Sequence, residues 1–293
     1  MRSIRKIAFQ NAAGERFGLN GENAVYAMSL SGLGFTLAPT FADLSRGFYA
    51  PVSDESEPQG TTAFTLVFTK KPYEVYKTLV DWLCAAGTVT LVYNPTGKQE
   101  YFKDVFINFL QKTELNAMGW LEIPCSFFSR TPWYMPTPAV LDLGTAGEKR
   151  SKRYTYRYNK QLKYGMDSSA ALSGTVIGAG HVPGALELTY VGSITNPKIR
   201  LVGNISGKTY GVCSVAVTLE PSDTLKFSSR YEQSYVKRIN AAGTETDLLD
   251  VLDLSSTPFF HIPVDEPCTV SIESDAAFFG RADLLIYYYY RSV

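Results

Sequence analysis

The chain has few of the residues from which catalytic and metal sites are usually built. It contains 2 histidines and 4 cysteines in 293 residues. A catalytic triad needs a histidine held between a nucleophile and an acid, whereas His181 lies in a Gly-Pro segment and His261 in the apolar stretch FFHIP. No CxxC pair and no histidine at zinc-ligand spacing accompany the cysteines, which are Cys84, Cys125, Cys213 and Cys268. We therefore expect no enzyme, no metal site and no cofactor.

A net charge of either sign and long apolar runs are also missing. The 28 Lys and Arg residues balance the 28 Asp and Glu residues, so the overall charge does not indicate a nucleic-acid or anionic-membrane partner. No stretch approaches the ~18 apolar residues of a membrane-spanning helix, and the N-terminus lacks the apolar core of a signal peptide. We expect cytoplasmic synthesis, free cysteines in preference to a Cys213–Cys268 disulfide, and no membrane span.

The abundant residues favour β-structure. Aromatic residues make up 13% of the chain, including 19 Tyr and 17 Phe, and such residues are enriched in strands. One helix is predicted over residues 72–86, because Pro72 suits a first helical position and Gly87 suits the stop. The apolar residues between them recur at helical spacing and should lie on a sheet; they are Val75, Tyr76, Leu79, Val80 and Leu83.

Breaks in the pattern predict two β-rich domains. Three prolines in TPWYMPTP end regular structure and close a first domain of residues 1–138. Residues 139–181 are expected to form a linker, and residues 182–293 a second domain whose short strands have the spacing of a β-sandwich. The acidic, proline-flanked segment 48–60 predicts a surface loop or hairpin tip.

Two glycine-rich motifs share part of their pattern with nucleotide-binding loops. Residues 203–209, GNISGKT, end like a P-loop, but three residues separate the glycines where four are needed, and strand-like sequences flank the motif. A hairpin turn is the better interpretation. The motif VIGAGHVPG precedes a proline and a strand, where a dinucleotide fingerprint needs a helix. Neither motif predicts a bound nucleotide.

Two carboxylate clusters are the candidates for glycosidase chemistry or calcium binding. They are Asp54, Glu55 and Glu57, and Asp247, Asp250 and Asp253. The first lies in a polar loop, and the second repeats every three residues between leucines, as on the polar face of a helical turn or bulged strand. Neither follows the EF-hand pattern. Solvated surface charge is the preferred interpretation of both.

The segment 149–163 is the best candidate for binding nucleic acid. It interleaves Lys and Arg with Tyr154, Tyr156 and Tyr158, so cations could meet phosphates while aromatic rings stack on bases. Since the whole chain has no net positive charge, we favour a contact between domains or subunits instead.

The order of patterns in the first domain resembles the distal tail protein family, the baseplate hub proteins of siphophages. The resemblance lies in the glycine-punctuated N-terminal strands, the helix that begins at KKPYEVYKTLVDWL, the stretches TVTLVYNPTGKQEYFKDV and GWLEIPCSFF, and the ending SRTPWY at Ser129–Tyr134. The second half resembles the family's C-terminal domain, a galectin-like or carbohydrate-module-like β-sandwich, through Asn196–Lys198 and the FFHIP stretch.

The resemblance implies an architectural role in the virion. Six copies would form a ring through their N-terminal domains, with the tail tube protein on one side and the tail-tip hub protein on the other. The C-terminal domains could hold receptor-binding or side-fibre proteins, and DNA would only pass through the channel. The segment 48–60 is our candidate for an arm between subunits, because it lies between strands.

Two other functions stay open at this point. A glycan-binding module would use tyrosines that stack on sugar rings, and the candidates are Tyr231, Tyr235 and Tyr287–Tyr290. A hydrolase of cell-wall polymers has little support, since no catalytic set converges. Tyrosines on strands more often mediate packing or protein contacts, which favours the structural role.

Overall fold

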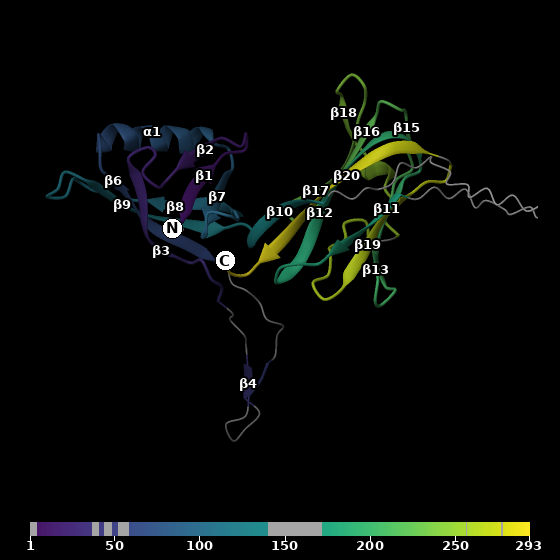
Figure 1. Ribbon diagram of the computed structural model, residues 1–293, viewed down its shortest axis with the longest axis horizontal. Coiled ribbons are helices and arrows are strands. Elements are labelled where there is room, and N and C mark those ends of the chain that lie inside the picture. The colour runs from purple at the N-terminus through teal and green to yellow at the C-terminus, as the bar shows by residue number, and fades with distance from the viewer. Residues whose placement is uncertain are drawn as a thin grey trace, which may run out of the picture. The chain divides into compact units, whose positions relative to one another are not determined.

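A computed structural model describes residues 5–36, 41–43, 49–51, 59–139, 172–255, 257–276 and 278–293 (Figure 1). The chain divides into two compact units: unit 1 comprises Met1–Met135 and Tyr289–Val293, and unit 2 comprises Pro136–Tyr288. Strands dominate both, and the described chain contains one α-helix, α1 (Pro72–Ala85). The prediction of a mostly β protein with one helix is confirmed. No described helix has the length and hydropathy needed to cross a lipid bilayer.

Unit 1 is built on an antiparallel sheet with the strand order β2-β1-β7-β8-β9-β6-β3. The strands are β1 (Lys6–Gln10), β2 (Arg16–Gly18), β3 (Val25–Ser31), β6 (Thr61–Phe68), β7 (Val89–Asn94), β8 (Tyr101–Leu110) and β9 (Leu121–Ser129), and β10 (Trp133–Ala139) pairs with β8. Just after β2, the Leu19 carbonyl accepts a hydrogen bond from the N–H of Ala27 on β3 (2.9 Å). The two outer strands therefore meet, and the sheet wraps around its core.

The core of unit 1 is aromatic at its centre. Phe9, Phe64 and Phe127 come from three different strands, and the rings of Phe64 and Phe127 stack with centroids 5.3 Å apart. The helix α1 adds the buried side chains of Leu79 and Leu83. Such burial against a sheet supplies most of a short helix's stability. The apolar spacing in the sequence therefore packs the helix on the sheet, as expected.

The ends of α1 follow the sequence signals. Proline occupies the first turn, and Gly87 has a φ of +68°, a conformation that favours glycine beyond a helix end. Tyr76 packs edge-to-face on Phe68 of β6, with centroids 6.0 Å apart. Figure 1 shows the helix lying along the sheet of unit 1.

Unit 2 has two facing sheets. One has the order β18-β17-β16-β12-β20, from β12 (Val182–Thr195), β16 (Thr224–Arg230), β17 (Gln233–Ile239), β18 (Glu245–Asp247) and β20 (Phe279–Tyr290), with β15 (Thr218–Leu219) beside β12. The other has the order β11-β19-β13-β14, from β11 (Leu172–Ile177), β19 (Pro267–Glu273), β13 (Lys198–Gly203) and β14 (Thr209–Ser214). A short 3-10 helix, η1 (Leu249–Val251), completes the described elements.

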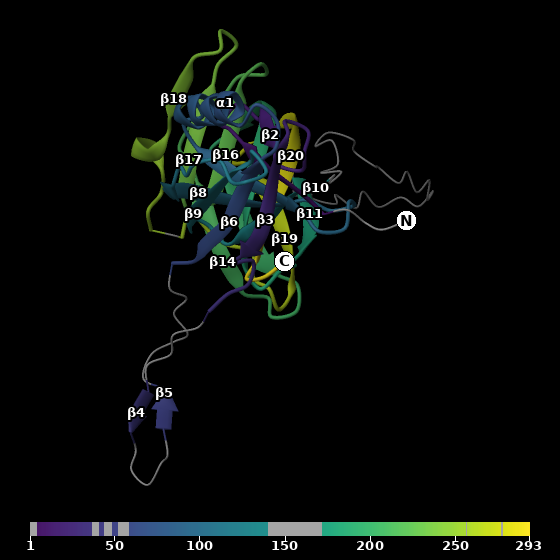
Figure 2. The same ribbon diagram turned by 90° about the vertical axis from the view of Figure 1, so that its left-hand side faces the viewer.

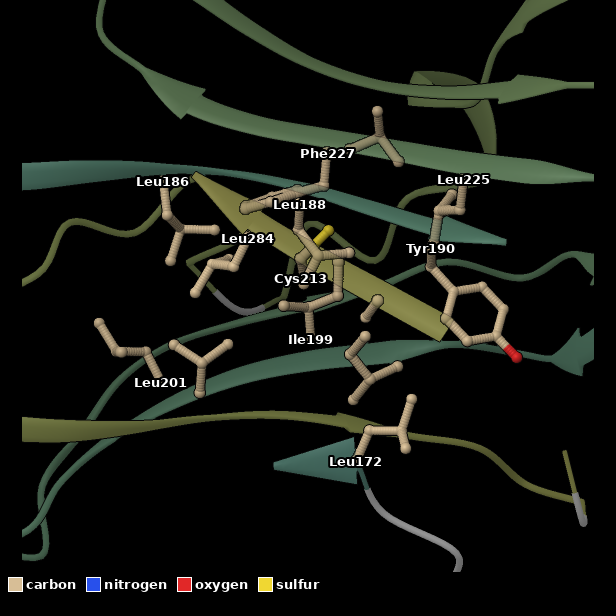
Figure 3. Packing of buried hydrophobic residues seen from close by; sticks show 14 of the residues in the cluster. Leu172, Leu186, Leu188, Tyr190, Ile199, Leu201, Cys213, Leu225, Phe227 and Leu284 are labelled. Carbon is tan, nitrogen blue, oxygen red and sulfur yellow. The ribbon is translucent and has the colours of Figure 1, made fainter. Parts of the chain in front are cut away.

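A single hydrophobic core fills the space between these two sheets (Figure 3). Leu186, Leu188 and Phe227 come from the first sheet, while Ile199 and Leu201 come from the second. Alternate residues of β13 are buried, as expected for strands with one face on a core. Cys213 and Cys268 belong to this core as free thiols, and burial raises the pKa of each.

Parts of the expected linker and arm are regular strands. β11 lies inside the range 139–181 and pairs along its length with β19. β4 (Phe41–Asp43) and β5 (Tyr49–Pro51) pair as an antiparallel hairpin (Figure 2), so part of segment 48–60 is the second strand of that hairpin. The remainder of that segment up to residue 58, and the basic segment 149–163, lie outside the described residues.

Candidate functional site

The GNISGKT motif is the turn between β13 and β14, as the hairpin interpretation predicts. The N–H of Gly207 donates to the carbonyl of Gly203 (3.0 Å), and the φ of Gly207 is +65°. Consecutive N–H groups of such a turn form a concave anion-binding surface. Here Glu266 occupies that surface, accepting hydrogen bonds from the N–H groups of Ile205 (3.1 Å) and Ser206 (3.0 Å).

Hydroxyl donors complete the coordination of Glu266. Both Tyr210 and Ser206 donate to its Oε1. These hydrogen bonds, with the largest effect from Tyr210, lower the pKa of Glu266 to about 2. The Lys208 ammonium lies 5.0 Å from the ring centroid of Tyr210. Because an internal carboxylate fills the turn where a phosphate would sit, the motif has a structural role.

Replacing Glu266 by glutamine should destabilise unit 2 at neutral pH. The carboxylate contributes stability fully above its ordinary pKa of 4.5, and this contribution is lost as the pH falls from there to about 2. We expect a lower denaturant midpoint for Glu266→Gln at pH 7, and wild type and variant should converge near pH 2. Denaturation across this pH range measures both effects. A matched control is Glu245→Gln, since Glu245 is exposed; an equal loss in the control would contradict the prediction.

The two histidines do not form a catalytic group. His261 stacks on the ring of Tyr231, with centroids 3.8 Å apart, and burial lowers the pKa of His261. Its Nε2 atom is buried without a hydrogen-bond partner in the described chain. His181 is exposed beside the start of β12. The packed imidazole of His261 lies outside the named strands.

The second carboxylate cluster is only partly brought together. Asp250 and Asp253 line a cavity of about 440 Å³ together with Asp275, while Asp247 lies on β18. Lys198 also lines that cavity, with its Nζ 3.5 Å from Asp275. No group of three His, Cys, Asp or Glu residues among those described has a metal-binding arrangement. The acidic residues Asp54, Glu55 and Glu57 lie outside the described residues.

The tyrosine run 287–290, a candidate for stacking on sugars, is buried or half-buried. Tyr287 is 7% exposed and Tyr289 is 1% exposed, because the two side chains lie on one face of β20 and this end of the strand buries that face. Tyr288 and Tyr290 pack against the cores of unit 2 and unit 1 respectively. Tyr231 is exposed, and Tyr235 is half-buried. The run therefore offers no continuous surface for stacking on sugar rings.

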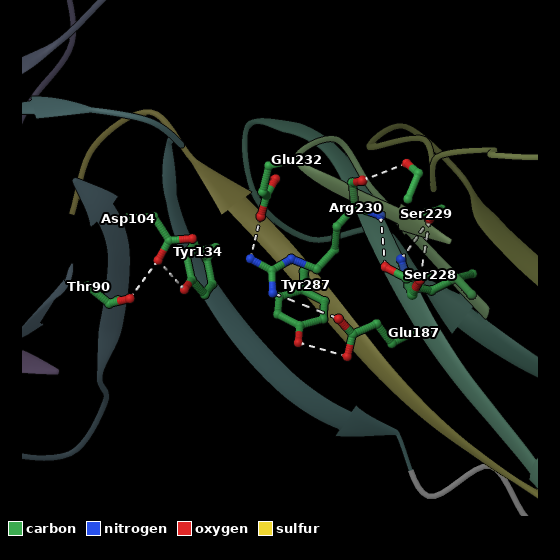
Figure 4. A network of polar contacts seen from close by, with 11 residues as sticks. Thr90, Asp104, Tyr134, Glu187, Ser228, Ser229, Arg230, Glu232 and Tyr287 are labelled. Carbon is green, nitrogen blue, oxygen red and sulfur yellow. Dashed lines mark hydrogen bonds and ion pairs between the residues drawn. The ribbon is translucent and has the colours of Figure 1, made fainter. Parts of the chain in front are cut away.

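Two polar networks involve further tyrosines (Figure 4). In unit 1, Asp104 accepts hydrogen bonds from Thr90 (2.7 Å) and Tyr134 (2.9 Å). In unit 2, the buried guanidinium of Arg230 pairs with Glu232 and lies 3.8 Å from Glu187. These contacts pair charged and polar side chains within each unit, which is the usual structural use of such residues.

An exposed apolar surface on the sheet of unit 1 was missed by the sequence reasoning. The strand register places its members on the face opposite the core, because Tyr26 pairs with Val67, Met28 with Thr65, and Phe106 with Phe128. Its members are 37% to 58% exposed; they are Tyr26, Met28, Phe106, Phe109 and Phe128, and we call them the outer face. The sequence signal for this surface is that β8 carries apolar residues at both odd and even positions, and therefore on both of its faces. Exposed apolar patches of this kind mark interaction surfaces.

Residues 6–129 match the family model of the distal tail protein N-terminal domain. Unit 1 therefore carries the N-terminal domain of the distal tail protein family. The matched range contains the sheet, the helix and the outer face of unit 1, so the resemblance inferred from the sequence is confirmed. None of the curated proteins compared matches the chain.

Solved structures show the same fold over nearly the whole chain. A chain of the phage P2 baseplate, in its activated conformation with calcium, is similar with a TM-score of 0.66 and 15% identity, covering 99% of this chain and 100% of that one. The Dit protein of phage SPP1 is similar with a TM-score of 0.57 and 8% identity, covering 97% of this chain and 98% of that one.

With this N-terminal domain, the chain is a structural, non-enzymatic protein of a phage tail. The expectations of a virion component and of no enzyme follow from the family and are confirmed. The absence of site residues and cofactors stays a prediction.

Proposed function

We propose that six copies of the protein form a ring through unit 1 and join the tail tube protein to the tail-tip hub protein. DNA passes through the central channel of such a ring without being recognised. The outer face carries the proposal, because it exposes five large apolar side chains on a regular sheet. Burying such a surface between subunits is favourable by about 25 cal/mol per Å².

The domain assignment is part of this proposal. Residues 1–138 form the ring domain and residues 139–181 connect it to the second domain. Residues 182–293 form a galectin-like or carbohydrate-module-like sandwich that holds receptor-binding or side-fibre proteins. The two facing sheets around one core in unit 2 support the sandwich. Segment 48–60 acts as an arm between neighbouring copies, and an unchanged oligomer size after its deletion would count against that role.

Substitutions in the outer face should prevent assembly. We expect the wild-type protein to form particles of six times the 32.4 kDa chain mass, visible as rings by electron microscopy. Phe106→Asp combined with Phe128→Asp should give monomers, because two desolvated carboxylates would face the neighbouring subunit. Mass photometry over a range of concentrations measures the change.

The control is Ile205→Asp, which places a carboxylate at a 77% exposed position of a turn in unit 2. This variant should assemble like the wild type. A wild-type protein that stays monomeric at high concentration, or a doubly substituted outer face that still forms rings, would overturn the proposed assembly.

A further inference from the structure

A cationic cavity opens in unit 1 where β6 begins and β9 ends. Its volume is about 560 Å³, and its polar lining includes Lys103, Ser129, Arg130 and Arg291. Among its described lining residues none is a carboxylate. Three cations around one cavity create a positive potential that attracts anionic groups.

Lys103 is the unusual residue of this cavity. Its side chain points to the core side of β8, like Val105 two residues along, and is only 5% exposed. The ammonium lies 4.5 Å from the ring centroid of Trp133. Within the described chain it has no hydrogen bond or ion pair, and burial lowers the pKa of Lys103 to about 8. Lysine is rarely buried unless it is paired.

The other buried charged groups of the described chain all have partners. Arg230 pairs with Glu187 and Glu232, Asp223 with Arg238, and Glu266 with the turn at Ser206. A buried charge without such a partner destabilises a fold. The position of Lys103 at the wall of a cavity therefore points to a counter-ion from outside the described residues of unit 1.

Ser129 gives a second, independent indication of a ligand. Its Oγ is buried and has no hydrogen-bond partner in the described chain, although the residue lines the same cavity. A hydroxyl in this situation can donate to an oxygen of a ligand. An ammonium and a hydroxyl beside two guanidinium groups are suited to carboxylate oxygens.

We propose that this cavity binds the acidic segment 53–57 of a second copy of the chain. The cavity is much larger than a single carboxylate needs, so it can admit several residues of peptide. Segment 53–57, SDESE, carries Asp54, Glu55 and Glu57, three carboxylates that match the three cations. The inference rests on the proposed ring, since it requires two copies in contact, and it names the site that receives the arm.

Peptide binding tests the cavity independently of the ring. The receptor is the full chain with Asp54→Asn, Glu55→Gln and Glu57→Gln, so that its own segments do not compete. A labelled peptide of residues 51–59 should bind this receptor in fluorescence anisotropy. A Lys103→Met receptor should bind it about tenfold or more weakly, whereas Lys98→Met, at an exposed lysine of the same unit, should leave binding unchanged.

Three results of this measurement would overturn the proposal. The first is that a peptide with neutral Asn and Gln at the three acidic positions binds as tightly as the acidic peptide. The second is that the acidic peptide binds the Lys103→Met receptor as tightly as the unsubstituted cavity. The third is that inorganic phosphate binds the receptor and the peptide does not. The last result would make the cavity a site for small anions.

Mixing two full-length variants tests whether the contact joins separate copies. Lys103→Met removes the receiving cation, and the neutralised segment 53–57 removes the ligand. Each variant alone should assemble poorly, but a mixture should form mixed pairs through the one intact contact. If no mixed pairs form, or if both variants form normal rings, the inferred contact is overturned and the proposed ring is unaffected. If the wild type is monomeric but still binds the peptide, the proposed ring is contradicted instead.

Discussion

Phe227→Ala should lower the free energy of unfolding of unit 2 by about 4 kcal/mol, because large-to-small changes of a buried aromatic residue cost about 3–5 kcal/mol. Phe227 is fully buried at the centre of the core between the two sheets. Its ring stacks on Phe260 with centroids 5.4 Å apart and on Phe259 at 6.1 Å. Alanine would remove these contacts and leave a cavity that two rigid sheets cannot close. Denaturant unfolding, followed by hydrogen exchange of peptides from unit 2, measures the loss.

Two further variants make this prediction specific. Phe227→Leu keeps most of the buried volume and should cost about 1 kcal/mol. Ile205→Ala changes a 77% exposed side chain and should alter stability by less than about 0.5 kcal/mol. A Phe227→Ala variant no less stable than Phe227→Leu would show that this position does not limit packing of the core.

Arg230→Met should destabilise unit 2 by about 3 kcal/mol, since removal of one partner from a buried ion pair leaves an uncompensated charge. The guanidinium is 10% exposed, and the side chains of Glu187 and Glu232 are 23% and 15% exposed. Its Cζ also lies 4.5 Å from the ring centroid of Tyr287, whose hydroxyl donates to Glu187 (3.0 Å). Methionine would leave the two carboxylates facing each other without a cation.

The charge explanation can be separated from lost packing. Adding Glu187→Gln and Glu232→Gln to Arg230→Met should recover much of the stability, because no unpaired charge then stays buried. Arg281→Met breaks an ion pair whose arginine is 80% exposed and should cost less than about 0.5 kcal/mol. Equal losses for Arg230→Met and Arg281→Met would contradict the assigned role of Arg230.

Local signals predicted individual elements well. The helix was expected over residues 72–86 and is observed at Pro72–Ala85, because proline, glycine and apolar spacing act within a few residues of one another. The β13–β14 turn was identified for the same reason. The tyrosine run was harder, since the buried face of β20 changes between Ile286 and Tyr287, which leaves Tyr287 and Tyr289 buried.

The residues of the proposed interaction sites could not be identified in this way. Lys103 stands in YFKDVF as an ordinary strand lysine, and the pairing of β8 with β10 and β9 brings it near Trp133 and Ser129. Phe106 and Phe128 are 22 positions apart in the chain, and the β8–β9 register makes them neighbours on one face. Glu266 lies 60 residues from Ser206, whose turn it fills.

By itself, the sequence determined the β-rich composition, the single helix, the turns and the resemblance of the first domain to the distal tail protein family. These depend on local propensities and on the order of patterns along the chain, which need no long-range contacts. The tertiary structure alone decided which charges are paired, which apolar residues stay exposed, and where a buried lysine meets a cavity. Those properties depend on strand register and on burial, because a shift of one residue moves every side chain of a strand to the opposite face.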